Sequence, residues 1–426
     1  MKKKVAVFPA GSEIGLEINR ALKYSTFFDV IGFSSMKDHT RYVYKEYIED
    51  LPFINDENFI DELNKRIEEK KIDFIYPAND DVQLYLTLNQ KSINAKIITS
   101  EEDTVKICRS KKSTYSFLKK EKFLPEIYEF NKELKFPLFI KPNIGQGSKG
   151  AKIINSLEEL LYEKEKNIDL VICEYLPGEE YTIDCFTDFE GKLRVVKQRN
   201  RKRIRIGISV NSKILELDPK VEKIANIINN YFKFNGAWFF QLKKDKNDEY
   251  KLLEIAPRIS GTMGLSRNTG INFPLLTLFN EEKIVIKIIQ NTYQIEVDRA
   301  FINRYKIELA YNYIYVDLDD TLINNKKVNS FLLMFLYQNI FNKKIVLITK
   351  HIKNIEETLN EYKICIKLFD KIIHLKKEDD KSKYIESKEA IFIDDSFSER
   401  INIQRKLKIP VFDTSEVESL IDWREI

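Results

Sequence analysis

Two aspartates two residues apart, Asp317 and Asp319, form part of the stretch "VDLDDTLI" (316–323), directly after the apolar run 313–316. Side chains two positions apart at the end of a strand face the same side, so both carboxylates can reach one ligand. An acidic pair at the end of a predicted strand is typical of a phosphoryl-accepting aspartate site. The sequence therefore predicts phosphate chemistry near residue 317.

Further polar residues lie at predicted strand ends or helix starts downstream of this pair. Thr349 follows "KKIVLI", Lys381 lies in "DKSKYI", and Asp394 and Asp395 end the strand of "EAIFIDD". In this order the motifs resemble those of the haloacid dehalogenase-like phosphatases, over about residues 311–426.

That resemblance implies a nucleophile, an acid–base group and a metal. Asp317 would attack phosphorus and form an aspartyl phosphate, while Asp319 would protonate the leaving oxygen and later activate water. The short spacings leave no room for a large cap domain. Thr349 and Lys381 would stabilise negative charge on the transferred phosphoryl group, and Lys383 is the alternative to Lys381. Mg²⁺ would be bound by Asp317, Asp395 and the backbone carbonyl of Asp319, with Asp394 farther from the ion.

A glycine-rich loop marks a second kind of phosphate chemistry. "KPNIGQGSKGAK" (141–152) places Lys141 at a predicted strand end, before a loop with several small residues. Glycines let backbone N–H groups turn towards phosphate oxygens. The loop residues expected to bind are Gly145, Gly147, Ser148 and Gly150.

Oxygen ligands follow in "CEYLPGEEY" (173–181) and in a predicted hairpin over 239–262. Strand alternation puts Glu254, Ala256 and Arg258 on one face, with Gln241 close across the hairpin. Hard oxygen ligands beside an arginine suit a magnesium–nucleotide phosphate site.

Together these motifs resemble the ATP-grasp superfamily over roughly residues 1–290, and most closely the carboxylate–amine ligases related to the large subunit of carbamoyl phosphate synthetase. The resemblance implies ATP and Mg²⁺ as cofactors and a pre-ATP-grasp domain ahead of the nucleotide fold. It assigns phosphate contacts to Lys111 and Lys141, the adenine hinge to Glu174, Tyr175 and Leu176, the ribose to Glu180, Mg²⁺ to Gln241 and Glu254, and the transferred phosphoryl group to Arg258.

One residue departs from the family pattern. The family usually has Asn where "EIAPR" has Ala256, so one metal ligand is missing and the number of bound ions is open. The basic cluster 197–205 is either a solvated strand face or a substrate site that uses Arg199, Arg203 or Arg205. Arg267 is a further candidate for an anionic substrate.

Composition limits the class of protein. The 426 residues include 70 Lys+Arg and 66 Asp+Glu, a balance that argues against a dedicated nucleic-acid partner. No apolar run is long enough for a membrane span. Four cysteines without a pairing pattern are typical of reduced thiols and predict a cytoplasmic protein. The expected partners are small-molecule carboxylate and amine substrates, phosphorylated or not, and a homo-oligomer is left open.

Alternating strand-like and helix-like stretches predict an α/β protein. We expect a Rossmann-like pre-ATP-grasp domain at 1–105, an α+β ATP-grasp domain at 106–300 and a capless, Rossmann-like haloacid dehalogenase-type domain at 301–426. The junction before the last domain is expected within 281–312.

The leading interpretation is a bifunctional enzyme. An ADP-forming carboxylate–amine ligase with an acyl phosphate intermediate would share the chain with a Mg-dependent phosphatase acting on a phosphorylated substrate or product of the same pathway. Two alternatives stay open: an ATP-grasp kinase of small molecules paired with a phosphatase, or a phosphatase with a non-catalytic ATP-grasp module that binds its ligand.

Overall fold

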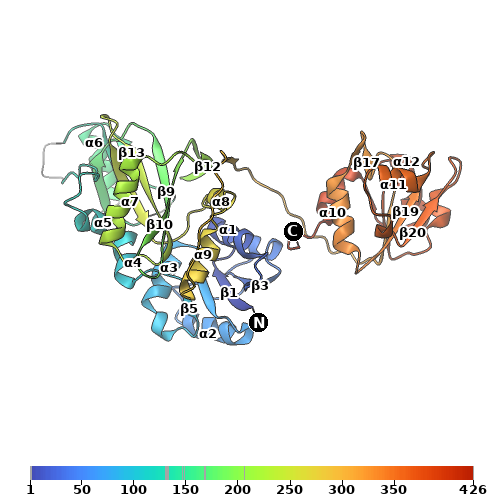
Figure 1. Cartoon of the computed structure of the whole chain (residues 1–426), viewed down its shortest axis with the longest axis horizontal. Helices are drawn as coiled ribbons and strands as arrows, with labels where there is room; N and C mark the ends of the chain where they lie inside the picture. Colours follow the sequence, from blue (N-terminus) through green and yellow to red (C-terminus); the bar gives the residue numbers. More distant parts are fainter. Residues whose placement is uncertain are drawn as a thin grey trace. The chain divides into compact units, whose positions relative to one another are not determined.

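The computed structural model describes residues 2–129, 134–145, 147, 149–166, 169–205 and 207–425. The chain divides into two compact units, Met1–Phe301 and Ile302–Ile426 (Figure 1). The division falls inside the segment 281–312, where the sequence predicts a junction. Each unit has its own sheets and its own core, and each is described by itself below.

A five-stranded parallel sheet begins the first unit, with the order β3-β2-β1-β4-β5. Its central strand is the apolar run "KKVAVF", in which Val5, Ala6 and Val7 are completely buried. The strands alternate with helices, as a doubly wound sheet requires. The elements are β1 (Lys3–Phe8), α1 (Glu13–Leu22), β2 (Phe28–Phe33), β3 (Glu46–Ile48), α2 (Phe59–Lys70), β4 (Phe74–Pro77), α3 (Asp80–Leu88) and β5 (Lys96–Ile97).

Two antiparallel sheets follow, with the orders β7-β6-β8 and β10-β9-β13-β14. Helix α7 packs on the second of them. Their strands are β6 (Leu138–Pro142), β7 (Lys152–Ile154), β8 (Leu170–Glu174), β9 (Glu180–Thr187), β10 (Leu193–Asn200), β13 (Gly236–Lys244) and β14 (Tyr250–Ala256). The helices are α4 (Glu102–Arg109), α5 (Lys111–Phe117), α6 (Leu157–Lys166), α7 (Pro219–Tyr231), α8 (Gly264–Arg267) and α9 (Phe273–Glu281).

One hydrophobic core joins the first sheet to the later part of this unit. It contains Val5 and Val7 of β1 together with Phe239 of β13 and Phe273 of α9. Helix α9 contacts both β13 and α1, as Figure 1 also suggests. The limit that the sequence predicts at residue 105 falls inside α4, so the helix crosses it.

A small three-stranded sheet, in the order β11-β12-β15, completes the first unit. Its strands are β11 (Arg203–Arg205), β12 (Ile208–Lys213) and β15 (Glu296–Asp298). The predicted junction segment therefore contributes a strand to the first unit before the second unit begins.

The second unit has a parallel sheet in the order β20-β19-β16-β21-β22. Because β16 pairs in parallel with both β19 and β21, the carboxyl ends of these strands meet at one edge. The elements are β16 (Tyr313–Val316), the hairpin β17 (Ile323–Asn324) and β18 (Lys327–Val328), α10 (Ser330–Asn339), β19 (Lys344–Thr349), α11 (Ile355–Glu361), β20 (Lys371–His374), β21 (Ala390–Ile393), α12 (Phe397–Leu407) and β22 (Val411–Phe412). Among the described residues, no helix combines the length and apolar character needed to cross a bilayer.

Candidate functional site

Two adjoining cavities occupy the first unit, with volumes of about 880 Å³ and about 230 Å³. The loops after β1 and β4 contribute Ser12, Asn79 and Asp80 to the larger cavity. The sheet β7-β6-β8 contributes to the smaller one. Nine residues line both cavities: Lys111, Gly145, Gly147, Lys149, Arg201, Gly207, Gln241, Leu253 and Glu254.

One buried and one partly buried lysine lie near this common wall. Lys141, at the end of β6, is 6% exposed, and its Nζ donates to Tyr115 Oη at 2.7 Å and to the Leu253 carbonyl at 3.0 Å. Burial lowers the pKa of Lys141. Burial also lowers the pKa of Lys111, against the attraction of Glu254, and the neighbouring Lys141 lowers it further. Within the described residues neither ammonium has a carboxylate ion-pair partner, so both would gain from phosphate oxygens.

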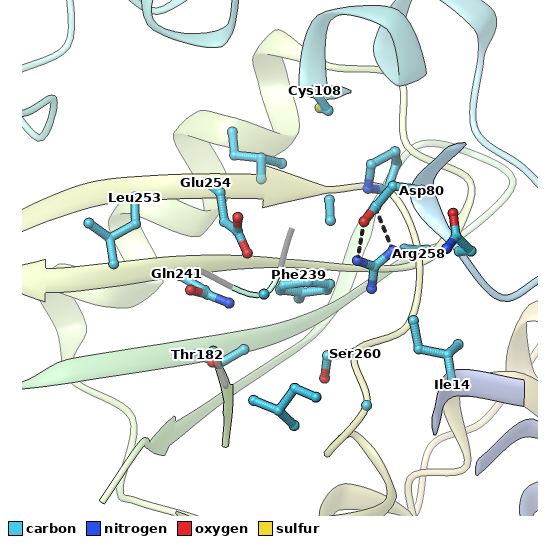
Figure 2. Close-up of a pocket in the computed structure, with 18 of the residues that line it drawn as sticks. Ile14, Asp80, Cys108, Thr182, Phe239, Gln241, Leu253, Glu254, Arg258 and Ser260 are labelled. Carbon is cyan, nitrogen blue, oxygen red and sulfur yellow. Dashed lines mark hydrogen bonds and ion pairs between the residues drawn. The ribbon is translucent and has the colours of Figure 1, made fainter. Parts of the chain in front are cut away.

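The predicted hairpin is present as β13 and β14. Gln241 is the direct cross-strand partner of Glu254, and Thr182 of β9 pairs with Gln241 on the other side. The three side chains therefore form a row across the sheet, as Figure 2 shows. The next row contains Phe239 and Ala256, which offer no oxygen ligand.

A β-bulge lies at the critical point of this hairpin. The register shifts between Gln241 and Leu242, so Leu253 is an extra residue on β14. The Leu253 carbonyl accepts hydrogen bonds from Lys141 Nζ and, at 2.8 Å, from Tyr115 Oη. The bulge thus turns a backbone acceptor towards the buried lysine and keeps Glu254 opposite Gln241.

Arg258 lies just beyond β14 and lines the larger cavity. Its Nε and Nη2 donate to the two carboxylate oxygens of Asp80, each at 2.6 Å (Figure 2). Burial would raise the pKa of Asp80, but Arg258, Arg109 and Lys111 together hold that pKa below its usual value. Both side chains are therefore charged, and the carboxylate of Asp80, which follows the first sheet's β4, faces the end of the hairpin.

The basic cluster 197–205 divides between the cavity and the surface. Arg199 is 1% exposed, lines the larger cavity and pairs with Asp184 at 2.8 Å. Arg201, which the sequence analysis missed, lines both cavities and pairs with Glu180 at 2.7 Å. Strand alternation from Arg199 was the signal that could have identified it.

Three arginines proposed for substrate binding lie elsewhere. Arg203 pairs with Asp298 at the exposed end of the small sheet, and Arg205 lies over the ring of Phe301. Arg267 donates to Glu17 at 2.9 Å. None of the three lines either cavity, so the structure does not bring Arg203, Arg205 or Arg267 to the site as expected. The exposed Asp298, the ring of Phe301 and the buried Glu17 are their partners instead.

The smaller cavity contains the residues expected at the nucleotide base and sugar. Glu174 ends β8 and accepts a hydrogen bond from the Glu126 N–H at 2.9 Å. Tyr175, the buried Leu176 and Glu180 line the same cavity. This end of the site offers apolar surface beside exposed backbone and carboxylate groups.

The glycine loop adjoins both cavities. Gly145 and Gly147 line them, and Gly147 and Gly150 have positive φ angles of 66° and 77°. A side chain at either of these two positions would strain the backbone. Gly150 is absent from the lining of both cavities, and Ser148 lies outside the described residues.

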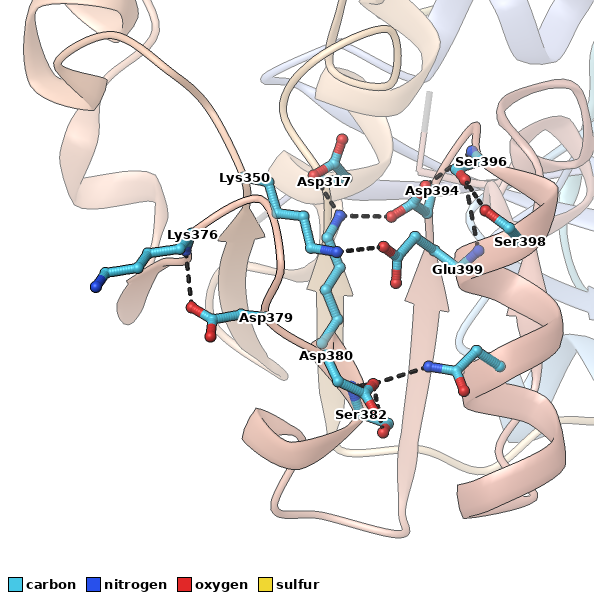
Figure 3. A network of polar contacts seen from close by, with 12 residues as sticks. Asp317, Lys350, Lys376, Asp379, Asp380, Ser382, Asp394, Ser396, Ser398 and Glu399 are labelled. Atoms are coloured by element: carbon cyan, nitrogen blue, oxygen red, sulfur yellow. Dashed lines mark hydrogen bonds and ion pairs between the residues drawn. The ribbon is translucent and has the colours of Figure 1, made fainter.

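A separate acidic cluster lies at the sheet edge of the second unit. Asp317 follows β16 and Asp394 follows β21, and Lys381 Nζ donates to both, at 2.6 Å and 2.7 Å (Figure 3). Ligand oxygens of Asp317, Asp394 and Asp395 lie within 4.8 Å of one another. Lys383 is exposed, whereas Lys381 is 3% exposed, so Lys381 is the lysine placed at the cluster.

Burial and like charge dominate the electrostatics of this cluster. Burial raises the pKa of Asp317 to about 6, with a further increase from Asp394 and an opposing effect from Lys381. Burial also raises the pKa of Asp394. Despite burial, the two carboxylates raise the pKa of Lys381 above its usual value. A bound cation would relieve the excess negative charge.

Asp319 and Thr349 lie at the rim of the cluster. The Asp319 carboxylate is half exposed and contacts His351 Nδ1 at 2.9 Å. Its side chain lies outside the group of clustered carboxylates and offers that group no ligand atom. Thr349 is fully buried at the end of β19, and its Oγ1 accepts from the His351 N–H at 3.2 Å. The sequence analysis did not identify His351.

Comparison with known proteins agrees with the architecture of the first unit. Residues 166–300 match a family described as ATP-grasp in the biosynthetic pathway with Ter operon. Over 199 residues the chain is 26% identical to the carbamoyl phosphate synthase large chain of Clostridium beijerinckii, a match that covers 41% of this chain and 17% of that protein. The matched region is thus less than a fifth of that relative's length.

Solved structures agree on the fold. The chain resembles N5-carboxyaminoimidazole synthetase from Staphylococcus aureus complexed with ADP, with a TM-score of 0.56 and 16% identity over 68% of this chain and 80% of that one. It also resembles the L-amino acid ligase from Bacillus licheniformis, with a TM-score of 0.52 and 20% identity over 66% of this chain and 74% of that one. The chain therefore contains an ATP-grasp fold, and the family match lies within its first unit.

Proposed function

Since the first unit carries this ATP-grasp fold, we propose that it is an ATP-dependent carboxylate–amine ligase. A substrate carboxylate oxygen would attack the γ-phosphorus of ATP, giving an acyl phosphate and ADP. An amine would then attack the acyl carbon, expel phosphate and lose a proton, leaving an amide. The observation that carries this proposal is the convergence of Lys111, Gln241 and Glu254 on the common wall of two cavities, with Lys141 in the lining of the smaller one.

The two cavities suit a nucleotide and a second substrate. The smaller would hold ATP, with Glu174, Tyr175 and Leu176 at the adenine and Glu180 at the ribose. Lys111, Lys141 and the loop of Gly145 and Gly147 would bind phosphate oxygens. The similarly folded proteins named above include one solved with ADP and one L-amino acid ligase, which supports looking for a nucleotide and an amino acid in these cavities.

The hairpin fits one magnesium ion. Glu254 and Gln241 offer a carboxylate and an amide oxygen side by side, the hard ligands that Mg²⁺ takes, and the ion would offset charge on the phosphates. Ala256 offers no ligand. Arg258 would contact the phosphoryl group during transfer, because its guanidinium lines the cavity two residues beyond this position.

A screen of purified protein would test the ligase. We expect ADP release that requires both a carboxylate and an amine, from panels of amino acids, sugar acids and phosphorylated amines, and a product whose mass equals the two substrates minus water. ADP release with one substrate that simply gains a phosphoryl group would replace the ligase by a kinase.

For the second unit we propose a Mg-dependent phosphatase of the haloacid dehalogenase-like type, acting on a phosphorylated substrate or product of the same pathway. The supporting observation is the buried Asp317–Lys381–Asp394 cluster at the carboxyl ends of β16 and β21. Asp317 would attack phosphorus, the ester oxygen would leave with a proton from Asp319, and water would release phosphate from the aspartyl phosphate.

The same cluster fits a magnesium ion. Asp317 and Asp395 carboxylates and the Asp319 carbonyl would hold it, with Asp394 beside them, and the ion would offset the repulsion between nucleophile and substrate. Thr349 and Lys381 would stabilise the transferring group. Hydrolysis of p-nitrophenyl phosphate that depends on added Mg²⁺ and stops with a chelator is the expected result; metal-independent or absent hydrolysis would count against it.

A further inference from the structure

We propose that Asp80 is a positioning residue for Arg258, so that the first parallel sheet orients the arginine of the ATP site. This inference rests on the ligase proposed above. Asp80 begins α3, after β4, whereas Arg258 follows β14. Residues 178 positions apart in the chain thus form a two-point contact inside the larger cavity.

The hydrogen bonds of Arg258 show which edge of its guanidinium remains for a ligand. A guanidinium carries five N–H groups. Asp80 occupies the edge formed by Nε and Nη2, and Nη1 donates to the Ile259 carbonyl at 3.0 Å. Among the described residues, these are the acceptors recorded for the group, so two N–H groups remain. Figure 2 shows the nitrogen that does not bond Asp80 on the side facing away from that carboxylate.

Further contacts make the arrangement rigid. Gln83, on the next turn of α3, donates from Nε2 to the Pro257 carbonyl at 2.6 Å, so α3 holds both the backbone and the side chain of this segment. The Arg258 guanidinium also lies over the ring of Phe239, 5.3 Å from its centre. A side chain fixed on these sides presents its free edge with little further loss of entropy.

The alternative is that Asp80 occupies the place of an anionic substrate and must leave Arg258 before binding. The side-on contact disfavours this, because a carboxylate on Nε and Nη2 leaves the outer edge of the guanidinium open. The hydrogen bond from the Gln83 side chain to the Pro257 carbonyl would also keep α3 in place if Asp80 moved away from Arg258. The two cases predict opposite effects of removing the Asp80 charge.

The test uses Mg·ADP with and without aluminium fluoride, which mimics the transferring phosphoryl group. In the full chain we expect fluoride to tighten ADP binding, measured by calorimetry. Asp80→Asn should reduce that tightening about tenfold or more, while binding of ADP alone stays unchanged. Asp80→Glu, which keeps the charge but shifts it by one methylene, should give an intermediate loss.

Asp81→Asn is the matched control. Asp81 lies in the same helical turn but is half exposed, pairs with Arg109 and does not line the cavity. It should behave like the wild type. Adding Asp80→Asn to Arg258→Lys should cost nothing beyond Arg258→Lys alone, because one residue acts through the other.

Several outcomes would overturn the inference. Asp80→Asn with the full fluoride effect would do so, and tighter binding of the mimic would show that Asp80 competes with the ligand. Equal loss of ADP binding with and without fluoride would indicate a merely structural role. A wild type that binds ADP but shows no fluoride effect would remove Arg258 from the phosphoryl group, and one that binds no ADP would overturn the ligase proposal itself.

Discussion

The two candidate sites differ in the sign of the charge that they leave unbalanced. In the first unit, Arg199, Arg201 and Arg258 each have a carboxylate partner. Lys111 and Lys141 form no ion pair among the described residues, although Glu254 and other carboxylates lie near them. In the second unit, one lysine lies between two buried carboxylates, with a third close by. The first site favours an anion, and the second favours a cation.

This difference suggests an order of events for each site. An anionic nucleotide can bind directly to Lys111 and Lys141, because its phosphates stabilise the ammonium groups that burial disfavours. A phosphate ester that approaches the second site meets like charge, and a cation must be bound before the ester is attracted. The predictions below would break or sharpen this contrast.

The largest effect is expected for Asp317→Asn. The neutral amide keeps the shape of the side chain but cannot attack phosphorus, so hydrolysis of p-nitrophenyl phosphate should fall on the order of 10³-fold or more. Formation of ADP should be unchanged. Phosphatase activity equal to that of the wild type would remove Asp317 as the nucleophile.

Glu254→Gln should have the next largest effect, in the other unit. It removes the carboxylate beside Gln241, so ADP formation should fall on the order of 10²-fold while phosphatase activity persists. The exposed Glu249→Gln, in the turn of the same hairpin, is the control and should retain ADP formation. Normal turnover in Glu254→Gln would separate the hairpin from the nucleotide site.

The two sites should also respond to pH with opposite signs. Asp317 must be ionised to attack, and its pKa is about 6, so phosphatase activity should rise through about pH 6, up to about tenfold per pH unit. Saturating Mg²⁺ should move this midpoint lower. Profiles at low and high Mg²⁺ would check it, and a midpoint insensitive to Mg²⁺ would contradict the shared site.

For Lys111 and Lys141 the expected pH dependence has the opposite sign. Their pKa values are lowered in the free protein, and phosphates should raise them again, so binding takes up protons and nucleotide affinity should fall as pH rises through that interval. Calorimetry of ATP binding in buffers of different ionisation enthalpy measures the uptake. Proton release instead would contradict the buried ammonium groups.

Ala256→Asn should have the smallest effect. It restores an amide oxygen in the row next to Glu254, and should lower the Mg²⁺ concentration needed for half-maximal ADP formation by a few fold, roughly, or leave it unchanged. A titration of activity with Mg²⁺ measures this. A large loss of activity would mean that a side chain larger than alanine at position 256 blocks part of the cavity.

Local patterns in the sequence predicted the strands and the residues at their ends well. Alternation places Gln241 opposite Glu254, and apolar runs that end in Asp317 and Asp394 predict two neighbouring strand ends. Such features depend on residues close in sequence or on the regular geometry of parallel strands. The fold class of the first unit is predictable for the same reason.

The missed features depend on contacts between distant segments. Nothing near Arg258 in the sequence indicates Asp80 as its partner, and nothing near Asp319 indicates His351. Arg203 and Arg205 share the alternation of Arg199, but a new strand begins at residue 203 and its sheet leads away from the cavity. Sequence spacing alone cannot report where such a strand turns.

The bulge at Leu253 has a consequence for mutational scans. The group that meets Lys141 is a main-chain carbonyl, so exchanging Leu253 for another side chain leaves that acceptor in place. Deleting the residue would remove the acceptor and restore a regular ladder, in which Glu254 still lies opposite Gln241. A scan that contains only substitutions therefore tests the Leu253 side chain in the cavity lining, whereas a deletion also tests the carbonyl group that meets Lys141.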